Sequence, residues 1–163
     1  MAHAHQGSVT PRVATLTVSD TRTEADDKSG QTLRALLAEA GFELAPHAIV
    51  RDDVEAIRSA VRAALDGAGT DAVIATGGTG IAPRDQTFEA VAPMLHKTLD
   101  GFGEVFRRLS WDEIGARSIL SRAVAGTVDR AVVIALPGST AAVSLAVTKI
   151  IAPMLPHAVA LLR

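Results

Sequence analysis

Cysteine is absent from the 163-residue sequence, and so is tyrosine. The lack of cysteine excludes disulfide bonds, thiolate zinc sites and a cysteine nucleophile. Aromatic residues make up only 3% of the chain, whereas 48% is hydrophobic, mainly alanine, valine, leucine and isoleucine. Small and branched apolar side chains suit helices that pack closely on a sheet. A chain of this length is expected to form one domain.

The sequence also lacks a large excess of either charge. Its formal net charge is −2, with 16 basic and 18 acidic residues. Such a balance offers no general basic surface that would neutralise a nucleic-acid backbone. We therefore expect no nucleic-acid partner, and any anionic ligand must be held by a local site.

Long apolar runs are missing too. No 18 consecutive residues are all apolar, so the sequence predicts no membrane span. Residues 1–11 are mostly polar and contain no apolar stretch of the kind found in signal peptides. We predict a flexible N-terminus over residues 1–11, one domain over residues 12–163, and a cytoplasmic protein without a membrane partner.

Short apolar runs alternate with helical periodicity along the chain. Strands are expected at residues 12–18, 43–50, 71–76 and 131–136. Helices are expected at residues 29–40, 54–65, 86–91 and 102–109, and from residue 139 onward. Residues 118–129 are irregular or form a short hairpin. This alternation predicts an α/β fold with a mostly parallel sheet covered by helices on both faces.

Proline and capping residues predict where helices begin and end. Ser29 is placed to cap the helix that ends before Gly41. Asp52, with Glu55 three residues later, forms a capping-box pattern ahead of the next helix. Pro153 and Pro156 are expected to end the last helix, ahead of a short final turn.

Chemically distinctive residues follow several of the predicted strands. They are Ser19-Asp20, Asp52, residues 76–80 and residues 137–139. In a parallel α/β sheet, ligands bind beyond the carboxyl ends of the strands. We therefore expect these segments to meet at one edge of the sheet.

The sequence Thr76-Gly77-Gly78-Thr79-Gly80 joins a predicted strand to a predicted helix. Glycines there allow backbone amides to approach an anion closely, so we interpret the loop as a phosphate cradle rather than an ordinary turn. It is not a Walker A loop, because the Lys-Ser/Thr ending is missing. It is not a dinucleotide fingerprint either, because Pro83 stands where the third glycine would be.

Each polar residue near these segments has two interpretations. Asp85 is either a Mg²⁺ ligand or the cap of the helix that starts at Gln86. Asp52 either belongs to a site at the end of its strand or caps the helix that follows it, with Glu55. Arg84 contacts a phosphate or is a solvated surface charge. Ser139 either caps a helix or holds an anion at its N-terminus.

Four further residues are candidates of the same kind. Ser19 lies either in a binding edge or in a plain loop, and Glu104 lies in the cleft or on a solvated helix face. Ser121 and Arg122 form a polar pair in the irregular stretch that is able to reach back over the site. The isolated histidines show no metal-ligand spacing, and no Gly-x-Ser-x-Gly elbow indicates a serine hydrolase.

The glycine loop, with Pro83-Arg84-Asp85-x-Thr87 after it, resembles the signature of molybdopterin-binding domains. These occur in bacterial MoaB and Mog proteins and in the gephyrin G domain. Further matching stretches follow in the same order, at residues 16–20, 26–30, 101–107, 109–110, 120–126 and 136–140. The likeness covers about residues 12–155, and several spaced motifs in register are more specific than one glycine loop.

This resemblance implies a three-layer α/β/α sandwich and a homo-oligomer, either a trimer or a hexamer. It implies that Mg-ATP and molybdopterin give adenylylated molybdopterin and pyrophosphate, ahead of a partner protein that inserts molybdate. Gly77, Gly78, Thr79 and Gly80 would hold nucleotide phosphate, and Asp85 and Asp52 would organise Mg²⁺. The residues implied to line the pterin or nucleotide pocket are Ser19, Ser121, Arg122, Pro137, Gly138, Ser139 and, in the same cleft, Glu104.

Three other functions remain open at this point. A non-catalytic pterin-binding or scaffold protein would share the fold, because fold does not determine activity. A nucleotide hydrolase is a second alternative. A dinucleotide oxidoreductase is disfavoured by Pro83. The intact Arg84-Asp85 pair favours the active adenylyltransferase.

Overall fold

The structure, a computed structural model, describes residues 9–163. Its middle layer is a six-stranded sheet in the order β2-β1-β3-β6-β5-β4. Four strands run parallel: β1 (Arg12–Val18), β2 (Glu43–Val50), β3 (Ala72–Thr76) and β6 (Ala131–Leu136). Strand β5 (Val124–Val128) is antiparallel to β6, and the short β4 (Lys97–Thr98) is antiparallel to β5. The predicted mostly parallel sheet is confirmed.

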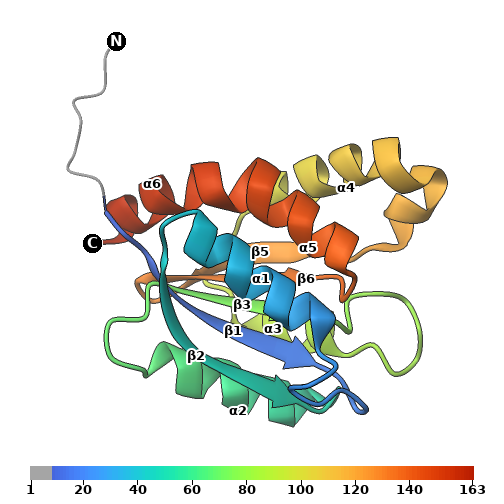
Figure 1. Ribbon diagram of the computed structural model, residues 1–163, viewed down its shortest axis with the longest axis horizontal. Coiled ribbons are helices and arrows are strands. Elements are labelled where there is room, and N and C mark those ends of the chain that lie inside the picture. The colour runs from blue at the N-terminus through green and yellow to red at the C-terminus, as the bar shows by residue number, and fades with distance from the viewer. Residues whose placement is uncertain (1–8) are drawn as a thin grey trace.

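Helices cover both faces of this sheet (Figure 1). One face carries α1 (Lys28–Glu39), α4 (Asp100–Ile114), α5 (Thr140–Ala146) and α6 (Ala152–Leu162). The other face carries α2 (Val54–Leu65) and α3 (Thr87–Val91), and a short 3₁₀ turn, η1 (Ala92–Met94), follows α3. The fold is therefore the predicted three-layer α/β/α sandwich.

Strand β3 shows why the sheet holds two cores. All five of its residues are buried. Ala72 and Ile74 belong to the core between the sheet and α1, α4 and α5, whereas Val73 and Ala75 belong to the core between the sheet and α2. Side chains alternate between the two faces of a strand, so a central strand covered on both sides must be apolar throughout.

The caps of α1 and α2 differ from the predicted ones. Asp27, not Ser29, caps α1 and accepts a hydrogen bond from the Gly30 amide at 3.0 Å. Asp53, not Asp52, caps α2 and accepts from the Ala56 amide at 2.9 Å. In each case a neighbouring aspartate takes the capping role, and at α2 this leaves the Asp52 carboxylate available for other contacts.

Of the two interpretations of residues 118–129, the hairpin is confirmed: a 3₁₀ segment, η2 (Gly115–Leu120), comes before β5, which forms a hairpin with β6. The C-terminal helix differs from the expectation. The last helix does not end at Pro153. It continues from α5 through a π-helical segment (Val147–Ile151) into α6, because Pro153 lies in the first turn of α6, where an N–H is dispensable. Pro156 lies inside α6, and the buried Leu155 and Val159 hold that helix on the core.

The helical stretch Thr140–Leu162 is long and apolar enough, by length and composition alone, to cross a membrane. One helix of this kind is weak evidence, because core helices pass the same test. Here Val143, Val147, Ile151 and Leu155 are buried against the sheet. We interpret the stretch as a core helix.

The start of the domain lies slightly before the predicted boundary. Pro11 is buried, and its carbonyl accepts a hydrogen bond from the Glu43 amide at 2.9 Å. Val9 packs against the core. Residues 9–11 are therefore part of the domain rather than of the predicted flexible N-terminus, and residues 1–8 lie outside the described residues.

Candidate functional site

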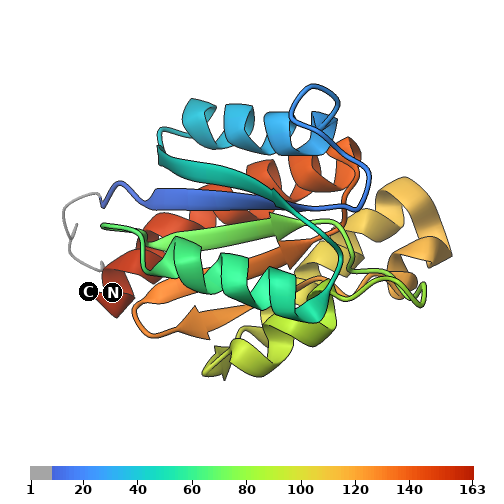
Figure 2. The same cartoon turned by 90° about the horizontal axis from the view of Figure 1, so that it is seen from below.

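The loops after the parallel strands gather at one end of the sheet, as predicted (Figure 2). Gly77 directly follows β3, and its amide donates to the Leu136 carbonyl at 2.9 Å. Its φ angle is +97°, and a Cβ atom added there would overlap the carbonyl oxygen of Val18. Only glycine fits this conformation and this contact, so the position is dictated by the close approach of three strands.

The turn after β6 packs on the same point. A Cβ atom on Gly138 would lie 3.1 Å from the Gly77 Cα atom, so the two glycine turns touch. Ser139 caps α5, and its hydroxyl accepts from the Ala142 amide at 3.1 Å. The predicted meeting of residues 76–80 with residues 137–139 is present, and the capping interpretation of Ser139 is confirmed.

Thr87 and Asp52 hold the outer part of the glycine loop. The Thr87 hydroxyl donates to the Gly77 carbonyl at 2.6 Å, and the Thr87 amide donates to the Gly78 carbonyl at 3.0 Å. Gly78 has a φ angle of +68°, and a Cβ atom there would lie 2.8 Å from Asp52 Oδ2 and overlap the Thr87 hydroxyl. The loop is thus narrow and leaves no space for a side chain.

Three carboxylates surround this loop. Asp52 Oδ1 accepts from the Gln86 amide at 2.9 Å, at the start of α3. Asp20 Oδ1 accepts from the Asp52 amide at 3.0 Å, and Asp20 also forms an ion pair with Arg84. Asp85 Oδ2 accepts from the Ala82 amide at 2.9 Å, so Asp85 closes its own turn and does not cap α3.

The electrostatics of these carboxylates differ. Burial raises the pKa of Asp52, and the charges of Asp85 and Asp20 raise it further against the hydrogen bond from Gln86. The hydrogen bond from the Asp52 amide lowers the pKa of Asp20, and Arg84 adds to this effect. Asp52 and Asp85 therefore form a negative centre beside the glycine loop that a cation would relieve.

Within residues 9–163, no three metal-ligating side chains converge on one point. Two carboxylates suit Mg²⁺ that arrives with a phosphate ligand, because Mg²⁺ usually takes one or two carboxylates and keeps water and phosphate oxygens. The described residues therefore do not form a metal site that consists of protein ligands alone.

Arg122 reaches this loop from the segment ahead of β5. Its amide donates to the Thr79 carbonyl at 2.9 Å, and its Nε donates to the Gly80 carbonyl at 2.9 Å. The guanidinium also forms an ion pair with Glu89 and lies 5.1 Å from the ring centre of Phe88. Sequence reasoning found Arg122 but missed Phe88 and Glu89, which directly follow Thr87 on α3.

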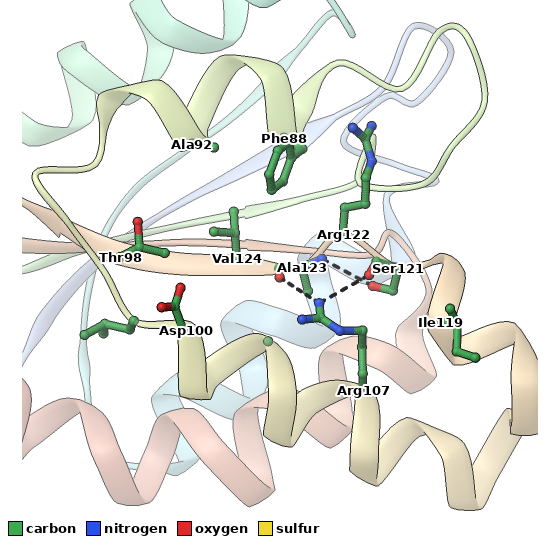
Figure 3. Close-up of a pocket in the computed structure, with 12 residues that line it drawn as sticks. Phe88, Ala92, Thr98, Asp100, Arg107, Ile119, Ser121, Arg122, Ala123 and Val124 are labelled. Atoms are coloured by element: carbon green, nitrogen blue, oxygen red, sulfur yellow. Dashed lines mark hydrogen bonds between the residues drawn. The ribbon is translucent and has the colours of Figure 1, made fainter.

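A cavity of about 420 Å³ lies between α3, α4 and the start of β5 (Figure 3). Its lining includes Phe88, Asp100, Arg107, Ser121 and Arg122. Arg107 Nη1 donates to the carbonyls of Ser121 and Ala123, both at 3.3 Å. Asp100 and Arg107 were not predicted; the only signal for them was that they flank or end the 101–107 stretch.

Ser19 and Glu104 lie differently from the other candidates. The Ser19 hydroxyl accepts from the amides of Thr21 and Arg22 at 3.2 and 3.0 Å, so it shapes the turn after β1 at the predicted edge. Glu104 is exposed on α4 and does not line the cavity beside β5, and its place in the cleft stays a prediction. The buried residues Phe102 and Phe106 fix the orientation of α4, and position 104 points away from their face.

Comparison with known proteins agrees with this geometry. A sequence profile described as probable molybdopterin binding domain matches residues 14–157. Molybdenum cofactor biosynthesis protein B of Bacillus anthracis is 49% identical over 156 residues, covering 95% of this chain and 92% of that protein. The Bacillus subtilis protein of the same name is 46% identical over 162 residues, covering 99% of this chain and 95% of that protein.

Solved structures give the same result. A crystal structure of molybdenum cofactor biosynthesis protein B has a TM-score of 0.93 and 48% identity, covering 96% of this chain and 98% of that one. The tungsten cofactor synthesizing protein MoaB from Pyrococcus furiosus has a TM-score of 0.84 and 38% identity, covering 94% of this chain and 99% of that one. The chain therefore belongs to the molybdopterin-binding domain family, together with the proteins named molybdenum cofactor biosynthesis protein B.

Proposed function

We propose that this chain is a molybdopterin adenylyltransferase that acts in molybdenum cofactor biosynthesis. It binds molybdopterin and transfers AMP from Mg-ATP to the terminal phosphate of molybdopterin, giving adenylylated molybdopterin and pyrophosphate. The family membership supports the pterin substrate. The observation that carries the nucleotide chemistry is the narrow glycine loop with Asp52 and Asp85 beside it.

The glycine loop fits a phosphate group. Within residues 9–163, the amides of Gly78, Thr79 and Gly80 donate to no protein acceptor, whereas the Gly77 amide is used by the sheet. Consecutive free amides in a glycine turn form an anion-binding concavity. A side chain at Gly78 would displace Thr87 and Asp52, which hold the loop in this shape. The loop is thus shaped to approach the nucleotide through its backbone.

Asp85 and Asp52 are the residues that would hold the Mg²⁺ of the nucleotide. Their carboxylates lie close enough that the charge of Asp85 raises the pKa of Asp52. Mg²⁺ supplies neutralisation of phosphate charge when it is bound with ATP. Asp52 keeps one oxygen on the Gln86 amide, so the start of α3 fixes the direction of this carboxylate.

The chemical step needs positioning more than a reactive side chain. An oxygen of the terminal phosphate of molybdopterin forms a bond to the α-phosphorus of ATP while the bond to the bridging oxygen of pyrophosphate breaks. Both reactants are anions, so the protein lowers the barrier by aligning them and by offsetting their charge. The loop amides would align the phosphates and offset part of their charge, and the two carboxylates would contribute by holding the Mg²⁺ of the nucleotide. No covalent intermediate is needed.

The pterin is proposed to bind beside the glycine loop, near Ser121 and the turn Pro137, Gly138 and Ser139. Ser121 lines the cavity next to β5, and Gly138 contacts Gly77. These residues therefore flank the loop on two sides. The distance between reacting groups would be set by the contact between the two glycine turns.

A homo-oligomer, trimer or hexamer, is also proposed. The C-terminal part of α4 and η2 expose four large apolar side chains: Trp111, Ile114, Ile119 and Leu120, which are 44–66% exposed. Clustered exposed apolar residues are typical of interfaces. A downstream molybdate-insertion protein that accepts the adenylylated product completes the proposed set of partners.

Pyrophosphate release from Mg-ATP, measured with and without molybdopterin, tests this function. We expect release only when molybdopterin is present, together with adenylylated pterin. Asp85→Asn is the matched variant, because the amide oxygen can still accept from the Ala82 amide but cannot neutralise Mg²⁺. Tight molybdopterin binding without pyrophosphate release from the unmodified protein would contradict the proposal.

A further inference from the structure

The loop of residues 80–85 depends on a contact from elsewhere in the chain. It projects from the carboxyl end of the sheet (Figure 1), and Ile81 at its tip is 66% exposed. Its internal bonds, from the Asp85 amide to the Ala82 carbonyl and from the Ala82 amide to Asp85 Oδ2, close only a tight turn, and the Arg84 side chain adds an exposed ion pair with Asp20. A protruding segment with few internal bonds is expected to be mobile unless another element holds it.

Arg122 supplies that contact at both ends of the loop. Nε donates to the Gly80 carbonyl at 2.9 Å, where the loop starts, and Nη2 lies 3.4 Å from the Asp85 carbonyl, where it ends. The Arg122 amide adds the bond to the Thr79 carbonyl. One residue, some 40 positions away in sequence, thus bridges the two ends of the loop that carries Asp85.

Helix α3 holds the guanidinium in place. Glu89 binds Nη1 and Nη2, the latter at 3.2 Å, and the Phe88 ring lies against its face. The hydrogen bond from Arg122 lowers the pKa of Glu89, so this carboxylate stays charged at neutral pH. Carbonyls and a carboxylate thereby accept from the Nε, Nη1 and Nη2 groups of Arg122, which leaves at most one N–H for a substrate phosphate.

We propose that Arg122 is a positioning residue, held by Glu89 and Phe88, that clamps the loop of residues 80–85 and so fixes Asp85. The effect on activity rests on the proposed function, whereas the effect on the loop does not. Glu89, which was not predicted from the sequence, thereby becomes part of the site as the residue that holds Arg122. Arg122 acts on the nucleotide through the loop and not by direct contact with substrate.

Lysine cannot replace this clamp. An ammonium group has no planar fork that reaches the Gly80 carbonyl, the Asp85 carbonyl and Glu89 together. We therefore expect Arg122→Lys to lower kcat/KM by about tenfold, the equivalent of one lost charge-assisted hydrogen bond. Glu89→Gln keeps an acceptor but removes the charge, and it should lower kcat/KM by about two- to fivefold, because the pair is partly exposed.

Hydrogen exchange on the ligand-free protein is the first measurement. The hydrogen-bonded amides of Ala82 and Asp85 and the Arg122 amide should exchange faster in Arg122→Lys, and by a smaller factor in Glu89→Gln. Arg108→Lys is the matched control, because Arg108 forms an exposed ion pair with Asp112 on α4. Loop exchange in the control should equal that of the unmodified protein. Unchanged loop exchange in both test variants would overturn the clamp.

Steady-state kinetics then separate positioning from substrate contact. The clamp predicts a higher KM for Mg-ATP and a lower kcat in both variants, with unchanged affinity for molybdopterin. Weaker molybdopterin binding in Arg122→Lys together with normal kinetics in Glu89→Gln would assign Arg122 to direct substrate contact and refute the proposal. If the unmodified protein releases no pyrophosphate, the adenylyltransferase function fails, while faster loop exchange in Arg122→Lys still supports the clamp.

Discussion

Gly77→Ala is the substitution that best tests the packing of the site. Gly77 has a φ angle of +97°, and an added Cβ atom would overlap the Val18 carbonyl at the end of β1. That carbonyl belongs to the backbone of a central strand and cannot move aside as a flexible side chain would. Gly41 has a similar φ of +85°, but a Cβ atom added there would meet no other atom within 4 Å.

The comparison separates two costs. A positive φ angle costs an alanine about 1 kcal/mol relative to glycine. The overlap with Val18 adds roughly 2 kcal/mol, within the range for overpacked sites. Gly77→Ala should therefore lose about 3 kcal/mol of unfolding free energy, and Gly41→Ala about 1 kcal/mol.

Thermal unfolding followed by circular dichroism measures both costs. At about 2 to 4 °C per kcal/mol for a chain of this size, Tm should fall roughly 6 to 12 °C in Gly77→Ala and roughly 2 to 4 °C in Gly41→Ala. Equal decreases in the two variants would show that the backbone angle alone sets the cost, and that the close approach of β1 to the glycine loop is not rigid.

The remaining predictions concern carboxylates. Asp52→Asn should abolish or strongly reduce adenylylation yet raise Tm at pH 7. Because the pKa of Asp52 is raised in the folded state, protonated Asp52 stabilises the fold below the ordinary aspartate pKa of 3.8, and this stabilisation is lost as the pH rises through the raised pKa. The increase in Tm caused by Asp52→Asn should therefore vanish in acid. A lower Tm of the variant at pH 7 would contradict this reasoning. Asp85→Ala should stop pyrophosphate release with an unchanged circular dichroism spectrum, and normal turnover would remove Asp85 from the mechanism. Asp27→Ala should lower the free energy of unfolding, measured by urea titration, by about 3 kcal/mol. The substitution removes the α1 cap and leaves Thr17 and His47 without their hydrogen-bond acceptor. A decrease of less than about 1 kcal/mol would refute this role of Asp27.

The sheet could be predicted because the same sequence pattern recurs at each parallel strand. Each parallel strand is an apolar run followed by a turn and a helical pattern, and β3 and β6 are buried along their whole length. The C-terminal end of the last helix was predicted wrongly, although its start at Ser139 was right, because the effect of proline depends on its position in a helix. Pro153 interrupts a helix in its interior but is accepted in a first turn, and the π-helical segment before it creates such a start.

The backbone part of the site could be predicted from composition, whereas the side-chain part could not. Glycines at residues 77, 78 and 138 indicate close approach wherever the strands lie. The role of Arg122 depends on Glu89 and Phe88, which come near it only in the folded chain. The exposure of Glu104 could not be predicted from the motif around it, because the buried side chains of Phe102 and Phe106 set the rotation of α4.

The one-residue error at Asp52 explains how the negative centre arises. Asp53 has the extended backbone of a helix cap and satisfies the Ala56 amide at the start of α2. Asp52 is thereby left to point across the turn to the Gln86 amide, half-buried and close to Asp85. Burial and like charge both oppose its ionisation, so this arrangement destabilises the ligand-free fold. The two adjacent aspartates therefore have different roles: Asp53 caps α2, and Asp52 carries a negative charge that a cation bound with a nucleotide phosphate would offset.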